Sequence, residues 1–279
     1  MTRSSYIAVL FAFFTLVLSA CSDYNKILKS TSAEKKYEAA LKYYEKQDYY
    51  RASTLLEELI PVLKGRPEAE KAQFYFAYTQ FYQRSYPLSA FHFKSFYDTY
   101  PRSEYAEEAL FMHAKSLYRD SPTFNLDQTS TYTAIEAIQD FLNRYPASKM
   151  KEEADKMYQE LSAKVERKAF ESARIYASMR YYQAAVTAFN NFQRNFPSSN
   201  YNEEALYLKL EAQYNLAERS VTEKQRERYF ETVAYYQDLV DKFPKSKYLK
   251  DAENFYDKSL KQLEKLKEPA NKEANTASK

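Results

Sequence analysis

The pattern of apolar and polar positions divides the 279-residue chain into three parts. Residues 7–18 are an apolar run that only Thr15 interrupts. Between about residues 33 and 263, apolar and aromatic positions recur among charged ones, as expected for helices joined by short polar turns. After Lys265 this periodicity stops and Pro, Asn, Ala, Ser and charged residues remain, so we expect residues 264–279 to be disordered.

The first apolar run is typical of a signal peptide. Arg3 is the only charged residue before Asp23, and the run of 12 residues is too short to cross about 30 Å of hydrocarbon. It ends in Leu-Ser-Ala-Cys at Cys21, the only cysteine of the chain. This ending looks like a lipobox, in which small residues admit the peptidase and the thiol accepts a diacylglycerol. We predict a signal peptide over residues 1–20 and lipid on Cys21; an ordinary signal peptide with a chance cysteine is the alternative.

Two or three acyl chains hold a protein stably on a membrane, whereas one does so marginally. Ser22 follows the cysteine at a position where Asp often signals retention in the inner membrane. We therefore expect a lipid-anchored protein on the periplasmic face of the outer membrane, with residues 21–32 as a tether.

Four segments share an aromatic residue, proline, any residue and serine. Proline stops the preceding helix, and serine is a good N-cap for the next. Acidic pairs such as Glu107-Glu108 then fall near the first helical turn, where they complement the helix dipole. The prolines are 45, 51 and 47 residues apart, which indicates a repeated helix pair. The segments are Tyr100-Pro101-Arg102-Ser103, Tyr145-Pro146-Ala147-Ser148, Phe196-Pro197-Ser198-Ser199 and Phe243-Pro244-Lys245-Ser246.

Small residues recur where the two helices of a pair must approach closely. In three pairs they are twelve apart, with a large residue (Leu56, Phe93 or Phe189) four positions after the second. In the third and fifth pairs they are twenty apart, which predicts longer turns around residues 120–129 and 218–226. This spacing resembles the tetratricopeptide repeat. The small residues are Ala40 with Ala52, Ala77 with Ser89, Ala173 with Ala185, Ala114 with Ala134, and Ala212 with Thr232.

The fold class predicted is all-α: a tetratricopeptide-repeat superhelix of about five helix pairs, with a C-terminal capping helix over residues 248–263. Lys149 to Met179 contains no helix breaker and is expected to be one long helix. We place an N-terminal half with repeats 1–3 at residues 33–148. A C-terminal half with repeats 4–5 and the capping helix occupies residues 149–263.

Composition excludes several functions. The chain has 1 Gly among 29 Tyr and 19 Phe, so the loops that cradle phosphates are absent from the sequence. A net charge of +3 from thoroughly mixed charges does not indicate nucleic-acid binding. The two histidines, His92 and His113, lie in helical segments without a cluster of ligands. We found no nucleophile with a base, and expect no enzyme activity, no metal and no cofactor beyond the lipid.

The lipobox, the tether and five repeats with the aromatic-Pro-x-Ser signature together resemble the BamD family of outer-membrane β-barrel assembly lipoproteins. The resemblance implies two tetratricopeptide halves. It also implies that the C-terminal half docks on the barrel-forming subunit and the N-terminal half receives unfolded barrel proteins. An aromatic-lined groove would suit barrel strands, which end in aromatic residues.

Candidate contact residues follow from this resemblance and from the distribution of side chains. We expect tyrosines of the N-terminal half to bind clients, although tyrosine simply replacing phenylalanine in the core is the alternative for each. In the C-terminal half, arginines and tyrosine, which are enriched in interfaces, would dock the partner. The client set is Tyr43, Tyr44, Tyr75, Tyr78 and Tyr82, and the partner set is Arg174, Arg180, Arg194 and Tyr181.

Two other classes stay open. The first is another tetratricopeptide envelope protein, either an adaptor for cell-wall hydrolases or a soluble coordinator of cell division. Soluble coordinators usually carry an N-terminal trimerising coiled coil, and no run of heptads precedes Ala33, which disfavours that version. A helical lytic transglycosylase would need a globular lysozyme-like domain, and no segment is left to build one.

Overall fold

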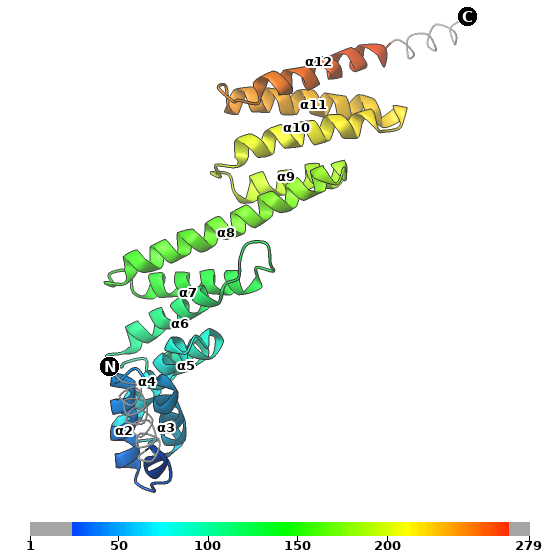
Figure 1. The fold of residues 1–279 in the computed structure, drawn as a ribbon. Helices are drawn as coiled ribbons and strands as arrows, with labels where there is room; N and C mark the ends of the chain where they lie inside the picture. Colours follow the sequence, from blue (N-terminus) through cyan, green and yellow to red (C-terminus); the bar gives the residue numbers. More distant parts are fainter. Residues whose placement is uncertain (1–23, 268–279) are drawn as a thin grey trace, which may run out of the picture. The chain divides into compact units, whose positions relative to one another are not determined.

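The computed structural model describes residues 24–267, and within that range every regular element is a helix (Figure 1). A short helical stretch at residues 24–28 precedes the first long helix. The helices are α2 (Ala33–Glu45), α3 (Tyr49–Val62), α4 (Glu68–Tyr82), α5 (Tyr86–Thr99), α6 (Ala106–Asp120), α7 (Thr129–Arg144), α8 (Lys151–Ser178), α9 (Tyr182–Asn195), α10 (Asn202–Glu218), α11 (Thr222–Lys242) and α12 (Leu249–Lys265). The predicted all-α repeat fold is confirmed, including the long helix and the final capping helix.

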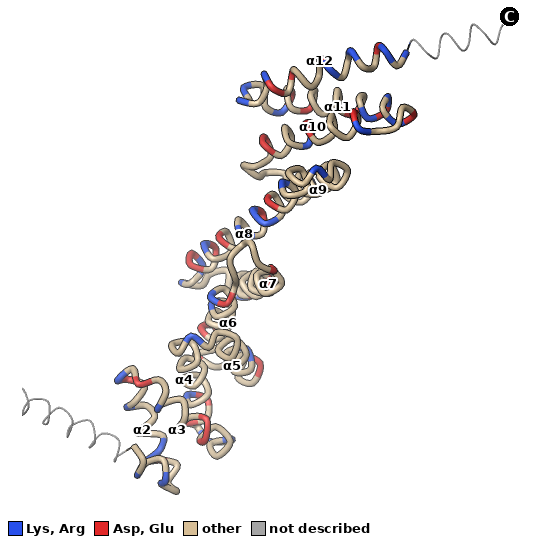
Figure 2. Tube along the Cα trace, turned by 45° about the vertical axis from the view of Figure 1, so that its right-hand side comes forward, with Lys and Arg blue, Asp and Glu red and all other residues tan. Residues whose placement is uncertain are grey.

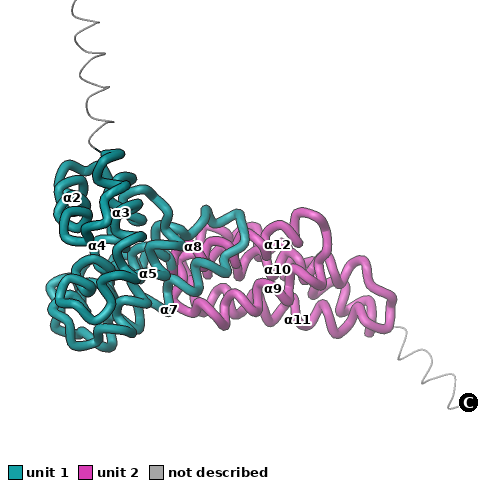
Figure 3. Tube along the Cα trace, turned by 90° about the horizontal axis from the view of Figure 1, so that it is seen from below, with its two compact units in different colours: residues 1–161 teal, residues 162–279 magenta. Residues whose placement is uncertain are grey.

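The chain forms two compact units, residues 1–161 and 162–279 (Figure 3). In unit 1, α2 packs on α3, α4 on α5, and α6 on α7; in unit 2, α10 packs on both α9 and α11, and α12 on α11. The sequence placed the division at residues 148/149, whereas these units divide inside α8. The reason is that Leu161 lies in the unit 1 core, while Phe170 lies in the core of unit 2.

The small residues predicted at helix crossings are buried. In the second pair, the Ser89 hydroxyl donates to the Ala77 carbonyl oxygen at 3.2 Å, so the two backbones lie close at the expected register. Ala173 and Ala185 belong to one core cluster together with Phe189. A side chain larger than alanine would force such helices apart.

Three pairs share one turn, in which a non-glycine residue takes the left-handed backbone conformation. Gln47, Arg84 and Arg180 have φ of 61°, 62° and 63°. In each, the following N–H donates to a carbonyl five residues back, as Ser85 does to Gln80 at 2.9 Å. Glycine usually occupies this position because it has no Cβ. A chain with 1 Gly therefore accepts about 1 kcal/mol of strain per turn.

The aromatic-Pro-x-Ser segments end helices as predicted, but their serines are not helix N-caps. The aromatic residue is the C-cap each time, and Tyr100 and Phe243 have similar φ of −125° and −134°. The serine hydroxyl accepts an N–H from two residues on: Ser103 Oγ accepts from Tyr105 at 3.0 Å, before α6 begins. Serine therefore stabilises the turn, since its side chain bonds locally before the helix starts.

The longer spacing of two pairs has two different structural causes. Between α6 and α7 the additional residues form a loop, in which the Gln128 side chain donates to the carbonyl of Thr123 at 2.8 Å. Between α10 and α11 the expectation of a long turn was wrong. There α10 ends at Glu218 and α11 begins at Thr222, so the additional residues lengthen both helices.

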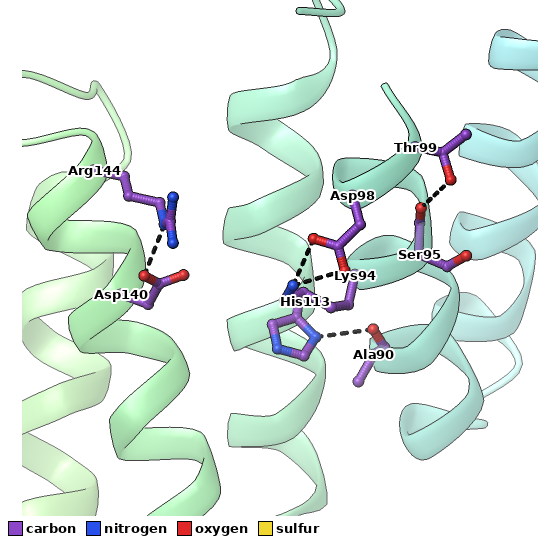
Figure 4. Close-up of polar contacts among 8 residues, drawn as sticks. All are labelled: Ala90, Lys94, Ser95, Asp98, Thr99, His113, Asp140 and Arg144. Carbon is purple, nitrogen blue, oxygen red and sulfur yellow. Dashed lines mark hydrogen bonds and ion pairs between the residues drawn. The ribbon is translucent and has the colours of Figure 1, made fainter. Parts of the chain in front are cut away.

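His113 is a packing residue between three helices (Figure 4). Its Nδ1 lies 2.9 Å from the Ala90 carbonyl oxygen. Burial lowers the pKa of His113, and Lys94 lowers it further. The hydrogen bond to the Ala90 carbonyl opposes them, and Asp98 and Asp140 do so more weakly. Burial also lowers the pKa of His92. Folding thus favours the neutral form of both histidines.

We expect Ala77→Leu and Ala173→Leu each to lower the free energy of unfolding by about 1–3 kcal/mol, because they overpack close crossings. Ala163→Leu, on the exposed side of α8, is the matched control and should change it by no more than about 0.5 kcal/mol. Urea denaturation measures all three. Equal urea midpoints for the buried and the exposed substitutions would contradict the predicted register of the helix pairs.

We expect folding stability to fall with acidification through the histidines. A lowered folded pKa means that the unfolded chain binds the proton first. The contribution is complete above the ordinary pKa of about 6.5 and is lost as pH falls below it. The His92→Gln/His113→Gln variant should therefore show a smaller loss of stability between about pH 6.5 and pH 5 in denaturant titrations. If the free energy of unfolding falls equally steeply with pH in the variant and the unsubstituted chain, the histidines do not cause the loss of stability.

Candidate binding surfaces

Five tyrosines of unit 1 pack together, and we call them the tyrosine cluster: Tyr44, Tyr49, Tyr75, Tyr78 and Tyr82. The Tyr44 and Tyr75 ring centroids lie 4.5 Å apart at 69°. Tyr82 stacks on Tyr49 at 4.5 Å and 18°, and on Tyr78 at 5.8 Å and 21°. These are the offset-stacked and edge-on geometries that aromatic pairs prefer.

Helix periodicity positions the cluster. Tyr75, Tyr78 and Tyr82 lie three and four residues apart on α4, so they share one face of that helix. Tyr44 comes from the last turn of α2, and Tyr49 is the first residue of α3. The left-handed Gln47 between them turns the chain back, so that both rings reach α4.

Two partly buried hydroxyls of the cluster, those of Tyr44 and Tyr78, are held in the protonated form. The Tyr78 hydroxyl donates to the Glu108 carboxylate, and burial, followed by this hydrogen bond, raises the pKa of Tyr78 far above its usual range. Burial and the neighbouring tyrosines raise the pKa of Tyr44 in the same way. Tyr82 is 47% exposed and presents its ring to solvent. The cluster therefore presents the exposed Tyr82 ring to solvent, and the partly buried Tyr44 and Tyr78 rings pack behind it.

Four of the five tyrosines expected to bind clients lie in this cluster, and Tyr43 does not. Its ring contacts Tyr24 at 5.6 Å, and the Arg51 guanidinium lies 5.6 Å from it. Adjacent residues on a helix point about 100° apart, so Tyr43 and Tyr44 face different neighbours. The sequence analysis did not include Tyr49 among the candidate residues. Its position directly after the turn at Gln47, as the first residue of α3, is the feature that could have indicated it.

A cavity of about 490 Å³ opens in unit 2 among α8, α9 and α10. Arg174 Nε lies 3.5 Å from Glu171, whereas Arg180 forms no ion pair with any residue in the described range. Burial, and Asp251 after it, raises the pKa of Glu211. The lining residues are Arg174, Ala177, Ser178, Arg180, Tyr182, Glu204, Leu208, Glu211, Ala212 and Asn215.

Two of the four predicted docking residues, Arg174 and Arg180, line this cavity, and two do not. Arg194 lies near the end of α9, where its guanidinium donates to Asn191 at 2.8 Å. Tyr181 is the N-cap of α9 and is exposed, while its neighbour Tyr182 lines the cavity. Apolar side chains next in sequence to the lining residues of α8 and the α8–α9 turn are exposed: Ile175, Tyr176, Met179 and Tyr181. Arginine beside exposed aromatic and aliphatic groups is typical of protein interfaces.

One buried cation of unit 2 is fully satisfied within the protein. The Lys209 ammonium donates to Asn190 at 3.2 Å and to Gln193 at 2.8 Å, and lies 4.2 Å from the Tyr235 ring centroid. Burial lowers the pKa of Lys209 to about 8. These contacts give Lys209 a structural role, because its donors already have partners.

No helix within residues 24–267 is both long and apolar enough to cross a bilayer. The same range contains no group of three His, Cys, Asp or Glu side chains arranged to hold a metal ion. Cys21, the predicted lipidation site, lies outside the described residues.

Residues 29–229 match the model of YfiO, described as an outer membrane lipoprotein. The chain belongs to this family. The match runs from just before α2 into α11, and so includes the tyrosine cluster and the unit 2 cavity.

A curated protein of Aquifex aeolicus (strain VF5) is 26% identical to this chain over 267 residues, covering 94% of this chain and 87% of its own length. It carries the provisional name outer membrane protein assembly factor BamD. Among solved structures, a human IFIT1 dimer with PPP-AAAA aligns with 94% of this chain at 15% identity. This chain spans 64% of that structure with a TM-score of 0.29, a likeness too slight to carry an argument.

Proposed function

We propose that this outer membrane lipoprotein is a non-catalytic scaffold of the β-barrel assembly machinery. It is anchored by lipid on Cys21 at the periplasmic face, binds unfolded outer-membrane proteins through unit 1, and docks on the barrel-forming subunit through unit 2. Family membership and the assembly-factor relative support the overall role. The tyrosine cluster is the observation that carries the client role.

The tyrosine cluster suits extended aromatic segments of varied sequence. Tyr82 is partly exposed and already stacks on two rings, so a client ring can extend the stack with little further ordering. A tyrosine hydroxyl both donates and accepts, so these side chains can bond to a client backbone. Such contacts depend on aromatic shape more than on one sequence, as a receptor for many barrel proteins requires.

The unit 2 cavity suits a folded partner. It combines two arginines with two glutamates, and the same stretch of chain, residues 174–182, carries exposed apolar side chains. Charges of both signs favour one orientation of a complementary surface, and exposed apolar side chains supply area to bury. An adaptor for cell-wall enzymes would use the same kind of surface, and the partner that co-purifies with the chain distinguishes the two functions.

We expect Tyr82→Ala to weaken binding of a synthetic peptide from the aromatic end of a barrel strand by about fivefold, which is about 1 kcal/mol of lost ring contact. Tyr132→Ala is the control, because Tyr132 on α7 is 53% exposed and outside the cluster. Fluorescence anisotropy with a labelled peptide measures both. Equal affinities for the two variants would remove the tyrosine cluster from the client role.

We expect Arg180→Glu to abolish co-purification of the barrel-forming subunit after mild detergent extraction, because it reverses a charge in the cavity. Arg84→Glu is a closely matched control. Arg84 occupies the same left-handed turn position in unit 1, with φ of 62° against 63°. Recovery of cell-wall amidases or peptidases in place of a barrel subunit would support the adaptor function instead.

We expect Cys21→Ala to give a folded periplasmic protein that is not membrane-bound. The reason is that Cys21 is the only cysteine and so the only thiol for acylation. Growth with radioactive fatty acid tests this, with the unsubstituted chain as the positive control. Label on the Cys21→Ala chain would show that the anchor lies elsewhere.

A further inference from the structure

A second cavity lies in unit 1, beside the first residues that the structure describes. Its volume is about 380 Å³, and it is formed by the end of α2, the start of α3 and the stretch before α2. One part of the lining is apolar and the other is mainly basic. The residues are Ile27, Ala39, Lys42, Tyr43, Lys46, Asp48 and Arg51.

The only carboxylate of this lining is already neutralised. Asp48 Oδ2 lies 3.2 Å from Arg51 Nη1, and Asp48 Oδ1 accepts the Arg51 backbone N–H at 3.3 Å. The same guanidinium lies 5.2 Å from the Tyr24 ring centroid. These contacts fix Arg51 at the wall of the cavity and leave the lysines to set its net charge.

Lys42 and Lys46 are exposed and form no ion pair with any residue from 24 to 267. They lie four residues apart on α2 and its C-cap, so their ammonium groups share one side of that helix. Two lysines without an ion pair, next to apolar lining residues, favour a ligand that has an anionic group joined to an apolar part.

Positive charge is concentrated in this part of the chain. Residues 24–51 contain seven Lys or Arg and four Asp or Glu, an excess of three that equals the net charge of the whole chain. Acidic and basic positions are mixed along α2 itself, as along the other helices (Figure 2). The excess comes from the residues on either side of α2, where Lys26, Lys29, Lys46 and Arg51 stand against Asp48. The basic excess therefore marks this region of unit 1.

The predicted lipid anchor lies close to the cavity along the chain. Cys21 precedes Tyr24 by three residues, which span at most about 10 Å when fully extended. Tyr24 in turn contacts Tyr43 and Arg51 of the lining. Acyl chains on Cys21 would thus hold the cavity within about one Debye length of the headgroups.

We propose that this cavity binds the phosphate of an anionic phospholipid in the membrane that carries the anchor. Lys42 and Lys46 contact the phosphate as point charges, and Ile27, Ala39 and Tyr43 cover the adjoining glycerol and upper acyl carbons. The inference rests on the proposed anchoring at Cys21. It adds a headgroup contact as a second membrane signal, which orients unit 1 at the surface.

The test uses the mature chain, residues 21–279, with Cys21→Ser, so that lipidation plays no part. Its sedimentation with phosphatidylcholine vesicles is compared with and without phosphatidylglycerol. We expect binding that requires phosphatidylglycerol and that weakens at least about tenfold in Lys42→Gln/Lys46→Gln. The control, Lys250→Gln/Lys261→Gln, removes the same charge from two exposed positions of α12 and should bind like the unsubstituted chain.

Three results would overturn the proposal. Equal weakening by both lysine pairs would show general charge attraction instead of a site. Binding that does not require phosphatidylglycerol would exclude recognition of the anion. Inorganic phosphate that binds the chain and displaces it from vesicles at matched concentration would identify a free-anion site. Failure of fatty-acid labelling at Cys21 in cells is a separate result, because it removes the anchor but leaves this vesicle measurement unchanged.

Discussion

The structure depends on the close crossing of two helices within each pair. Two helices can approach only as far as the side chains at their crossing allow, and here those side chains are alanine, serine or threonine. The close approach places large residues such as Phe93 and Phe189 between helices, where they are fully buried. Each pair then offers an apolar face that the next pair covers.

The repeat architecture could be predicted because its determinants are local and recur in the sequence. Proline spacing gave the helix ends, and small-residue spacing gave the register within each pair. The left-handed Gln47, Arg84 and Arg180 could not be foreseen, because glycine is the residue that normally marks this turn. The spacing between Ala212 and Thr232 was ambiguous too, since additional residues can form a loop or lengthen helices, and contacts decide between the two.

The candidate surfaces were predicted less well than the helices, because adjacent residues can face different sides. Tyr43 and Tyr44 illustrate this. Tyr44 joins the tyrosine cluster, while Tyr43 lines the basic cavity. Likewise Tyr182 lines the unit 2 cavity and Tyr181 does not. Composition located the right segments, but a shift of one residue on a helix changes direction by about 100°, which only packing resolves.

Tyrosine and phenylalanine form many of the packing contacts in this chain, which has 1 Gly and no Trp. Tyr105 stacks on Phe74 at 4.6 Å and Tyr201 stacks on Phe170 at 4.6 Å, each two residues after the turn serine. The same stacking geometry thus closes helix pairs internally and, at Tyr82, faces solvent. A core built from tyrosine can present a binding edge without a change of chemistry, since each ring has an apolar body and a polar tip.

Helix α8 belongs to both hydrophobic cores, with Leu161 in one and Phe170 in the other. The part of α8 in unit 1, residues 151–161, is too short to be stable alone in water, where helices below about 12–15 residues are marginal. Melting of α8 in one unit therefore removes hydrogen bonds that support its continuation in the other. The two units are therefore coupled in folding through the backbone of α8. A defect in the core of unit 2 lowers the local stability of unit 1 at its C-terminal end.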